Sequence, residues 1–386
     1  MRIGITCYPT YGGSGIVATE LGLELARRGH EVHFISYASP IRLDMGTPGI
    51  FYHEVEVSNY PLFHYPPYSL ALASRMSEVA ERHRLDLLHV HYAIPHSISA
   101  LLAQQMTKNR HLPFITTLHG TDITLVGSDP SYFPITKFSI EQSNGITTIS
   151  EYMRKRTVEF FGVKNPIEMI HNFVNCSLYQ PDEEGRSHDP KRIMHVSNFR
   201  PVKRVLDCIH VFAKVRKEVD AELIMAGDGP DRGPAERLAW ELGVSETVKF
   251  LGKQDHLERI IPHAHVLHLP SETEAFGLAA LEAMACGVVP VATRTGGVPD
   301  LITDGVDGFM EPVGNHASQA GRVIDLLTNP KLHRSMADAA RKTATDRFCT
   351  DLIIPQYEAY YRNVCEGPGT EESPAVSKTA VRSAGI

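Results

Sequence analysis

The sequence SETEAFGLAALEAMACGVVPVAT occupies residues 271–293 and follows the apolar run 264–270. A polar loop comes first, an alanine-rich helical segment follows, and a second apolar run (287–293) ends the stretch. Two apolar strands joined by a helix are typical of a parallel sheet that is covered on both faces. The stretch therefore predicts one βαβ unit of a doubly wound α/β domain.

The same alternation of apolar runs and helical segments extends over most of the chain. The expected strands are 2–8, 31–37, 85–92, 113–120 and 145–150 in the first half, and 192–198, 221–227, 247–252, 264–270 and 287–293 in the second half. In the first half, the segments 14–28, 69–83, 95–108 and 151–161 have helical spacing. Two such series in tandem predict two Rossmann-like domains, each with a parallel sheet.

A polar connection rich in proline and glycine separates the two series near residues 172–190. We therefore expect an N-terminal domain over 1–172 and a C-terminal domain over 173–349, because domain boundaries favour such segments. A helix over 350–366 is expected to pack back toward the N-terminal domain. The tail 367–386 lacks apolar periodicity, which predicts disorder.

Composition excludes several classes of protein. The formal net charge of −7 argues against a nucleic-acid partner, which usually needs a basic face. No apolar run reaches the roughly 20 residues that span a bilayer, so we expect no membrane insertion. The six cysteines are scattered without a CxxC pair, which predicts reduced thiols in a cytoplasmic protein rather than disulfides or a zinc site.

The stretch 271–293 also contains an E-x7-E pattern formed by Glu274 and Glu282. Eight helical residues turn through roughly 800°, which would leave the two carboxylates near one face. Gly277 allows the backbone to approach a ligand closely, and the positive end of the helix points toward the same place. Carboxylates accept pairs of hydrogen bonds, so this pattern predicts a site for the hydroxyls of a sugar or a ribose.

A glycine-rich loop, Gly12 to Gly15, follows the first expected strand and precedes a helix. Residues 13–18 match the dinucleotide pattern G-x-G-x-x-A, so a nicotinamide-dependent oxidoreductase has to be considered. The acidic residue expected at the end of the second strand is missing, since that strand ends in Ser36 and Tyr37. We therefore favour a loop that binds a small anion with backbone N–H groups and the Ser14 hydroxyl.

Two further loops have chemistry of their own. SNFRPVKR (197–204) places Arg200, Lys203 and Arg204 before a helix, which suits a diphosphate. LHGTD (118–122) follows an apolar strand, and the carboxyl ends of such strands are where open α/β sheets bind ligands. His89, His91 and His96 are a weaker candidate for metal ligation, and no D-x-D motif occurs, so no metal site is predicted.

Taken together, these motifs resemble glycosyltransferase family 4, which has the GT-B fold, over roughly residues 1–365. The second half carries SNFRPVKR, MAGDGP, SETEAFGLAALEAMACGVVPVAT, GGVPDLI and DGVDGF. The first half, through GITCYPTYGGSGIVATELG, YPPYSLALASRMSEVA, LLHVHYAIPHS and TTLHGTDIT, is similar to a member of the bacillithiol pathway. The resemblance implies two domains facing a cleft, retaining transfer from UDP-N-acetylglucosamine to L-malate, and no metal or other cofactor.

The resemblance also implies roles for individual residues. The residues implied to take part in catalysis are His119, Lys203 and Glu274. Those implied to bind the donor are Arg200, Lys203, Gly252, Lys253, Gln254, Glu274, Ala275, Phe276, Gly277, Leu278 and Glu282. Those implied to bind the acceptor are Gly13, Ser14, Tyr92, Thr121 and Lys137, of which Lys137 rests on the loosest match.

Other functions remain open on the sequence alone. A related transferase could use another small anionic acceptor, such as inositol phosphate. A UDP-sugar epimerase, a nicotinamide-dependent oxidoreductase and a non-catalytic sugar-nucleotide-binding module are the further alternatives. The sequence also leaves open whether the chain forms a homodimer.

Overall fold

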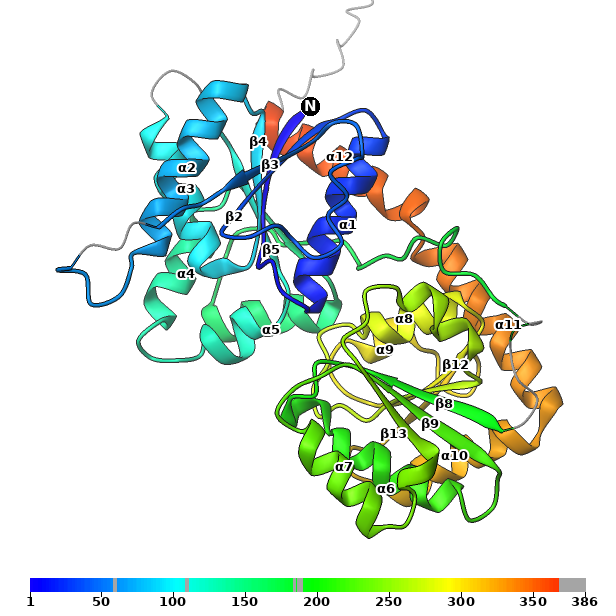
Figure 1. Ribbon diagram of the computed structural model, residues 1–386. Helices are drawn as coiled ribbons and strands as arrows, with labels where there is room; N and C mark the ends of the chain where they lie inside the picture. The colour runs from blue at the N-terminus through cyan, green and yellow to red at the C-terminus, as the bar shows by residue number, and fades with distance from the viewer. Residues whose placement is uncertain (58–60, 108–110, 183–184, 186–189, 368–386) are drawn as a thin grey trace, which may run out of the picture.

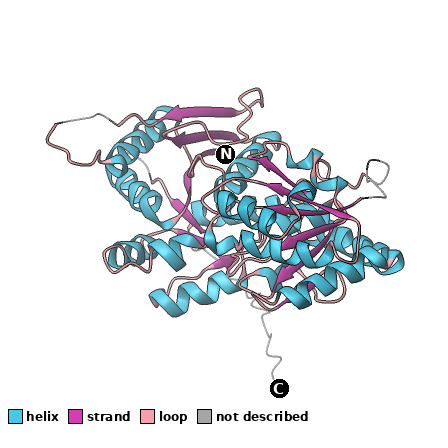
Figure 2. Ribbon diagram, turned by 60° about the horizontal axis from the view of Figure 1, so that its bottom comes forward, coloured by secondary structure: helices cyan, strands magenta, loops and turns pink. Residues whose placement is uncertain are grey.

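The computed structural model describes residues 1–57, 61–107, 111–182, 185 and 190–367. Figure 1 shows two domains, an N-terminal one coloured blue to teal and a C-terminal one coloured green to orange, each with helices beside a sheet. Figure 2 shows the same strands between helices from a second direction. The predicted α/β class with two parallel-sheet domains is confirmed.

The N-terminal sheet has the strand order β3-β2-β1-β4-β5-β6-β7, and all its pairs are parallel. Its strands are β1 (Arg2–Thr6), β2 (Glu31–Ser36), β3 (Ile50–Glu54), β4 (Leu87–His91), β5 (Phe114–Leu118), β6 (Gly145–Thr148) and β7 (Glu168–Met169). Its helices are α1 (Gly13–Arg27), α2 (Tyr68–His83), α3 (Ile98–Met106), α4 (Phe133–Glu141) and α5 (Glu151–Phe161), with wide helical turns at η1 (Ala93–Ser97) and η2 (Asp122–Val126). The order reverses between β1 and β4, where such sheets bind ligands.

The C-terminal sheet repeats this arrangement in the order β10-β9-β8-β11-β12-β13, again with parallel pairs. Its strands are β8 (Lys191–Val196), β9 (Ala221–Ala226), β10 (Val248–Gly252), β11 (Val266–Leu269), β12 (Val289–Thr293) and β13 (Phe309–Glu311). Its helices are α6 (Val205–Val215), α7 (Arg232–Glu241), α8 (Leu278–Ala285), α9 (Val298–Leu301), α10 (His316–Thr328) and α11 (Pro330–Arg347). The short turns are η3 (Pro201–Lys203), η4 (Ser245–Thr247), η5 (Leu257–Arg259) and η6 (Ile261–His263).

The structure contains elements that the sequence analysis did not predict. These are β3, β7, β13 and α4. β3 lies at the edge of its sheet and buries only Ile50 fully, so it lacks the continuous apolar run that marks a central strand. β7 has two residues and β13 has three, which is too short for a periodic pattern.

The last helix, α12 (Thr350–Glu366), leaves the C-terminal domain and lies against the N-terminal one, in orange-red beside α1 in Figure 1. The Tyr361 hydroxyl is 2.7 Å from Nδ1 of His89 on β4. Glu358 accepts hydrogen bonds from Arg28 just after α1, at 3.0 and 3.1 Å. The chain thus crosses between the domains twice, and the proposed boundary at 172/173 lies in the first crossing. The predicted disordered tail lies outside the described residues except for Gly367.

One disulfide joins the two crossings. The structure pairs Cys176 with Cys349, whose Cα atoms are 5.7 Å apart and 173 residues apart in the sequence. Beside it, Val174 and Cys349 form an isolated parallel bridge. The expectation that all six cysteines are free is therefore wrong for these two. The fold brings these two cysteines together, and their spacing in the sequence does not predict the disulfide.

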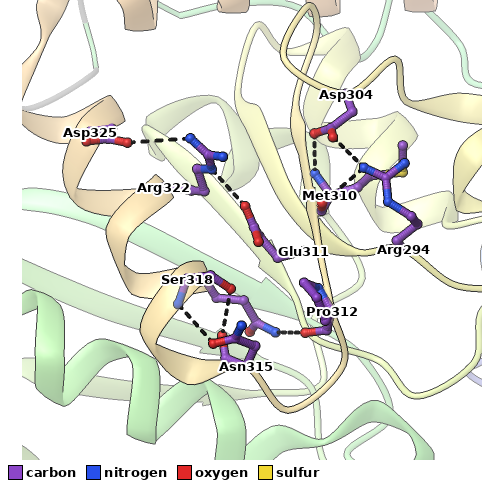
Figure 3. A network of polar contacts seen from close by, with 10 residues as sticks. Arg294, Asp304, Met310, Glu311, Pro312, Asn315, Ser318, Arg322 and Asp325 are labelled. Carbon is purple, nitrogen blue, oxygen red and sulfur yellow. Dashed lines mark hydrogen bonds and ion pairs between the residues drawn. The ribbon is translucent and has the colours of Figure 1, made fainter.

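The motif DGVDGF forms a turn that leads into β13. Asp304 accepts a hydrogen bond from the Met310 backbone N–H at 2.9 Å and also pairs with Arg294. Glu311 on β13 accepts from Arg322 of α10 at 2.7 Å. Figure 3 shows these contacts linking the turn, β13 and α10. The motif is therefore structural, since it fixes the outer edge of the C-terminal sheet.

Candidate functional site

A cavity of about 620 Å³ lies between the domains, at the carboxyl ends of both sheets. It is lined by residues that follow β1, β2, β8, β9, β10 and β11. The predicted site residues that line it are Gly13, Arg200, Lys203, Lys253, Gln254, Glu274, Leu278 and Glu282. The two glutamates of the E-x7-E pattern therefore face one cavity, together with cations from the loops after β8 and β10.

Glu274 is nearly buried and has two polar partners. Its Oε1 accepts hydrogen bonds from Lys203 Nζ at 2.5 Å and from the Ser271 hydroxyl at 2.9 Å. Lys203 lies at the end of the short turn η3, so the motif SNFRPVKR and the E-x7-E loop meet here. The Lys203 charge is thus compensated by a carboxylate at the wall of the cavity.

The loop that contains Glu274 is held from behind. A side chain at Gly296 would collide with the Glu274 carbonyl oxygen, since its Cβ would lie 1.8 Å away, and Gly296 has a φ of +56°. The Gly297 N–H donates to that same carbonyl at 2.9 Å. Ser150, from the N-terminal domain, donates to the Ala275 carbonyl at 2.7 Å. The segment GGVP therefore fixes the loop, and the loop touches both domains.

Gly277 stands directly before α8 with a φ of +98°, and Leu278 and Ala279, the first two residues of this helix, line the cavity. The Phe276 side chain points the other way: it is buried against Phe348, with ring centroids 5.6 Å apart. Ala275, Phe276 and Gly277 do not line the cavity, so their contacts with the donor stay a prediction.

Glu282 lies on α8 and is buried. Its Oε1 accepts from the Tyr179 hydroxyl at 2.9 Å and lies 3.7 Å from Arg42, which is on the N-terminal domain. Burial raises the pKa of Glu282, and Arg42 and Tyr179 oppose this shift. Arg42 also lies 3.9 Å from Glu20. Glu282 therefore links the two domains as well as facing the cavity.

The cations of the basic loop after β8 do not all face the cavity. Arg200 is exposed and lines the cavity beside Lys203. Arg204 instead donates to Asp207 at 2.6 Å and does not line the cavity. Two of the three predicted cations therefore face the site.

The loop after β10 provides a further wall. Lys253 and Gln254 line the cavity, and Lys253 Nζ lies 5.2 Å from the ring centroid of Tyr11 on the N-terminal domain. The Tyr11 hydroxyl donates to Asp255 at 2.7 Å. Gly252 has a φ of +71°, and its carbonyl accepts from the Gly227 N–H at 2.8 Å. Gly252 shapes the loop without lining the cavity.

Three predicted acceptor residues converge at the N-terminal domain. The Tyr92 hydroxyl hydrogen-bonds to both Ser14, in the first turn of α1, and Thr121, after β5. Burial raises the pKa of Tyr92, and the negative charge of Asp122 adds to the shift while the Arg200 charge opposes it. Gly13 lies next to Ser14 and lines the cavity. A cluster of hydroxyls thus lies beside the start of α1, within the electrostatic influence of Arg200 from the C-terminal domain.

His119 is buried next to this cluster. Its Nε2 is 2.8 Å from Nδ1 of His91, and burial lowers the pKa of His119 to about 3, so the ring is neutral. Asp122 accepts from the backbone N–H groups of Gly120 at 2.7 Å and of His119 at 3.2 Å. Burial raises the pKa of Asp122 to about 6, which those N–H groups oppose. Asp122 therefore orders the turn that presents His119 and Thr121.

Some residues differ from the sequence analysis. Lys137 lies on α4, 3.7 Å from Glu141, and does not line the cavity. Its local match was loose, and the structure does not bring it to the acceptor cluster. Conversely, Arg42, Tyr179 and Tyr11 were missed. Arg42 and Tyr179 come from loops without a motif. Tyr11 directly precedes the glycine-rich loop, and its role depends on its contacts with Lys253 and Asp255 of the other domain.

Two parallel-sheet domains that meet at such a cavity define the GT-B architecture, and comparisons with known proteins agree. Residues 11–178 match the model described as Glycosyltransferase Family 4, and residues 179–343 match Glycosyl transferases group 1. The chain belongs to this glycosyltransferase family.

Relatives span nearly the whole chain. It is 46% identical to N-acetyl-alpha-D-glucosaminyl L-malate synthase of Bacillus anthracis, over 94% of this chain and 97% of that protein. It is 25% identical to D-inositol 3-phosphate glycosyltransferase of Mycobacterium bovis, over 90% of this chain and 78% of that protein.

Solved structures share the fold at lower identity. Sucrose-phosphate synthase from Thermosynechococcus elongatus superposes with a TM-score of 0.78 at 20% identity, covering 94% of this chain and 98% of that one. An Anabaena protein in complex with UDP-glucose superposes with a TM-score of 0.77 at 18% identity, covering 94% and 99%. Within the described residues, no helix is long and apolar enough to cross a membrane.

Proposed function

We propose that the chain transfers N-acetylglucosamine from UDP-N-acetylglucosamine to the hydroxyl of L-malate, with retention of the α-configuration. One observation carries the proposal: a single interdomain cavity has carboxylates and cations on one wall and the start of α1 on the other. The similarity to the Bacillus anthracis synthase supports the two substrates. The product would be N-acetyl-α-D-glucosaminyl L-malate, in bacillithiol biosynthesis.

The C-terminal wall suits a nucleotide diphosphate sugar. Arg200 and Lys203 would neutralise the diphosphate, helped by the backbone N–H groups before α8. Glu274 would accept hydrogen bonds from the sugar hydroxyls. Glu282 would hold the uridine ribose, because both of its contacts among the described residues go to Oε1, which leaves Oε2 for a diol. The loop 252–254 would meet the uracil.

The N-terminal wall suits a small dianion. No acidic side chain occupies the first turn of α1, and no side chain among the described residues caps it. Its backbone N–H groups and positive dipole end are therefore available to a carboxylate. The hydroxyls of Ser14, Tyr92 and Thr121 add donors beside it. Lys137 is not needed for this arrangement, because Arg200 is the cation whose charge acts on the pKa of Tyr92.

The reaction needs few groups from the protein. The acceptor oxygen attacks C1 of the sugar on the face from which UDP departs, and the bond between C1 and the β-phosphate oxygen breaks. That phosphate oxygen takes the proton of the acceptor hydroxyl, so no separate protein base is required. Lys203 and Arg200 would stabilise the charge that develops on UDP, and His119 would line the reaction centre as a neutral ring.

We propose that this transfer is independent of a metal ion. Two cations and a helix start already lie where the diphosphate would sit, and the sequence has no D-x-D motif. Activity that persists unchanged in excess EDTA would support this part of the proposal. Activity that EDTA abolishes and Mg²⁺ or Mn²⁺ restores would contradict it.

The test of the whole proposal is incubation of the protein with UDP-N-acetylglucosamine and L-malate. We expect a product with the mass of the glycoside, one UDP per product, and an α-anomeric proton by NMR. D-inositol 3-phosphate, D-malate and water alone serve as comparison acceptors. Transfer to the inositol phosphate but not to L-malate would favour the alternative acceptor, and a β-linked product would overturn the retaining mechanism.

A further inference from the structure

Three histidines meet at the outer edge of the N-terminal sheet, away from the interdomain cavity. His33 lies on β2, His53 on β3, and His83 is the last residue of α2. One ring nitrogen of each lies within 4.8 Å of a ring nitrogen of both others. None of the three lines the cavity or takes part in the proposed transfer.

The fold brings these side chains together for a simple reason. β2 and β3 pair in parallel, with His33 opposite Phe51 and Ile35 opposite His53, so His33, Phe51 and His53 share one face of the sheet. The rings of His33 and Phe51 stack at 4.7 Å between centroids, and those of His33 and His53 at 5.2 Å. The His83 ring, from the helix that covers this face, lies 4.6 Å from that of His33. Three separate elements therefore fix the cluster.

Two of the ring nitrogens are separated by almost the distance expected between two ligands of one ion. His33 Nδ1 and His53 Nε2 are 2.9 Å apart. Two ligands on a tetrahedral zinc ion lie about 3.3 Å apart, since zinc–nitrogen bonds are about 2.0–2.1 Å. A small separation of the two rings would therefore admit the ion.

Two arginines near the cluster carry their own counter-charges. Arg2 lies 3.4 Å from Glu31, and Arg75 lies 2.7 Å from Glu78.

We propose that His33, His53 and His83 form a binding site for one zinc ion. Zinc favours imidazole nitrogen in a tetrahedral arrangement, and three protein ligands leave a fourth position for water. His53 and His83 are partly exposed, so an ion can reach them from solvent. The ion would tie the edge strand β3 to β2 and to the end of α2.

The test uses the full chain without an affinity tag, stripped of metal with EDTA and then dialysed. We expect calorimetric titration with Zn²⁺ to show one site per chain, and Zn²⁺ to raise the thermal midpoint of unfolding. Co²⁺ in its place should give the visible absorption of a tetrahedral nitrogen site. Because His33 is buried and its loss could unfold the domain, the variants are His53→Gln and His83→Gln.

Each variant should weaken Zn²⁺ binding at least tenfold, and the double variant should lose the thermal shift. His64→Gln is the matched control, since His64 is exposed, lies on the loop after β3 and should leave binding unchanged. Wild-type protein that binds no stoichiometric Zn²⁺ would overturn the proposal. So would a double variant that binds Zn²⁺ as the wild type does, because the ion would then lie elsewhere.

Discussion

The two domains share the strand order of a six-stranded sheet, to which the N-terminal domain adds β7, but the carboxyl ends of their sheets present different chemistry to the shared cavity. The C-terminal side presents charges in pairs, such as Lys203 with Glu274 at 2.5 Å. The N-terminal side lines the cavity with the start of α1, and the hydroxyls around Tyr92 and the neutral ring of His119 lie next to that helix start. One topology can therefore carry two kinds of site, because the loops after the strands, and not the sheet, set the chemistry.

The largest effect should follow from removing a charge on the C-terminal side. Lys203→Ala should lower kcat by about 100-fold, since loss of one group that stabilises developing charge typically costs 100- to 1000-fold. Steady-state kinetics with both substrates varied would measure this. The control is Lys217→Ala, because Lys217 is an exposed lysine of the same domain. Near-normal kcat in Lys203→Ala would remove this residue from the proposed mechanism.

A second change on the same side should affect binding instead of chemistry. Glu282→Ala should raise the KM for the UDP-sugar about tenfold, because it removes the proposed ribose acceptor and leaves Arg42 without one of its two carboxylates. Glu218→Ala, at an exposed position of the same domain, is the control. A normal KM for the UDP-sugar would show that Glu282 serves only the contact between the domains.

A change on the N-terminal side should alter the KM for the other substrate, L-malate. Thr121→Val removes the hydroxyl that contacts Tyr92 and should raise the KM for L-malate about fivefold, the value of one neutral hydrogen bond. The KM for the UDP-sugar should stay within twofold of the wild-type value. In the control variant Thr328→Val, the KM values for both substrates should stay within twofold. A change in the UDP-sugar KM alone would reverse the proposed assignment of the two walls.

The smallest effect concerns the stability of the N-terminal domain at lower pH, through His96 in η1. Burial lowers the pKa of His96 to about 4, so from pH 7 to pH 6 the unfolded chain takes up about half a proton there and the folded chain almost none. Folding stability therefore falls as the pH falls, by about 0.7 kcal/mol for this residue. Urea unfolding at both pH values should show that loss reduced by this amount in His96→Gln but not in His64→Gln. An unchanged loss in His96→Gln would contradict a neutral His96.

Much of the fold could be predicted from the sequence because the central strands are continuous apolar runs. β4 and β5 are fully buried along their length, and the strands expected at 85–92 and 113–120 contain them. The edge strand β3 escaped prediction because only Ile50 is buried in it, while the other four residues are partly or fully exposed. Packing on one face only leaves too weak a periodic signal over five residues.

The candidate site was predictable where a motif carried it. Glu274, Glu282, Arg200 and Lys203 line one cavity, and each belongs to a patterned loop or helix start. Arg42 and Tyr179 could not be predicted in the same way. The contact of Arg42 with Glu282 depends on how the two domains meet, and that of Tyr179 depends on how the polar connection after residue 172 packs on α8. The histidine cluster likewise depends on the unpredicted β3.

The disulfide between Cys176 and Cys349 turns the C-terminal domain into a covalent ring, since the chain enters and leaves that domain at the bonded pair. A single backbone cut between these two residues would open the ring without releasing a fragment. The two halves of the cavity would remain parts of one molecule until the bond was reduced. Protease nicking followed by electrophoresis, with and without reductant, would therefore reveal the ring as a change from one band to two.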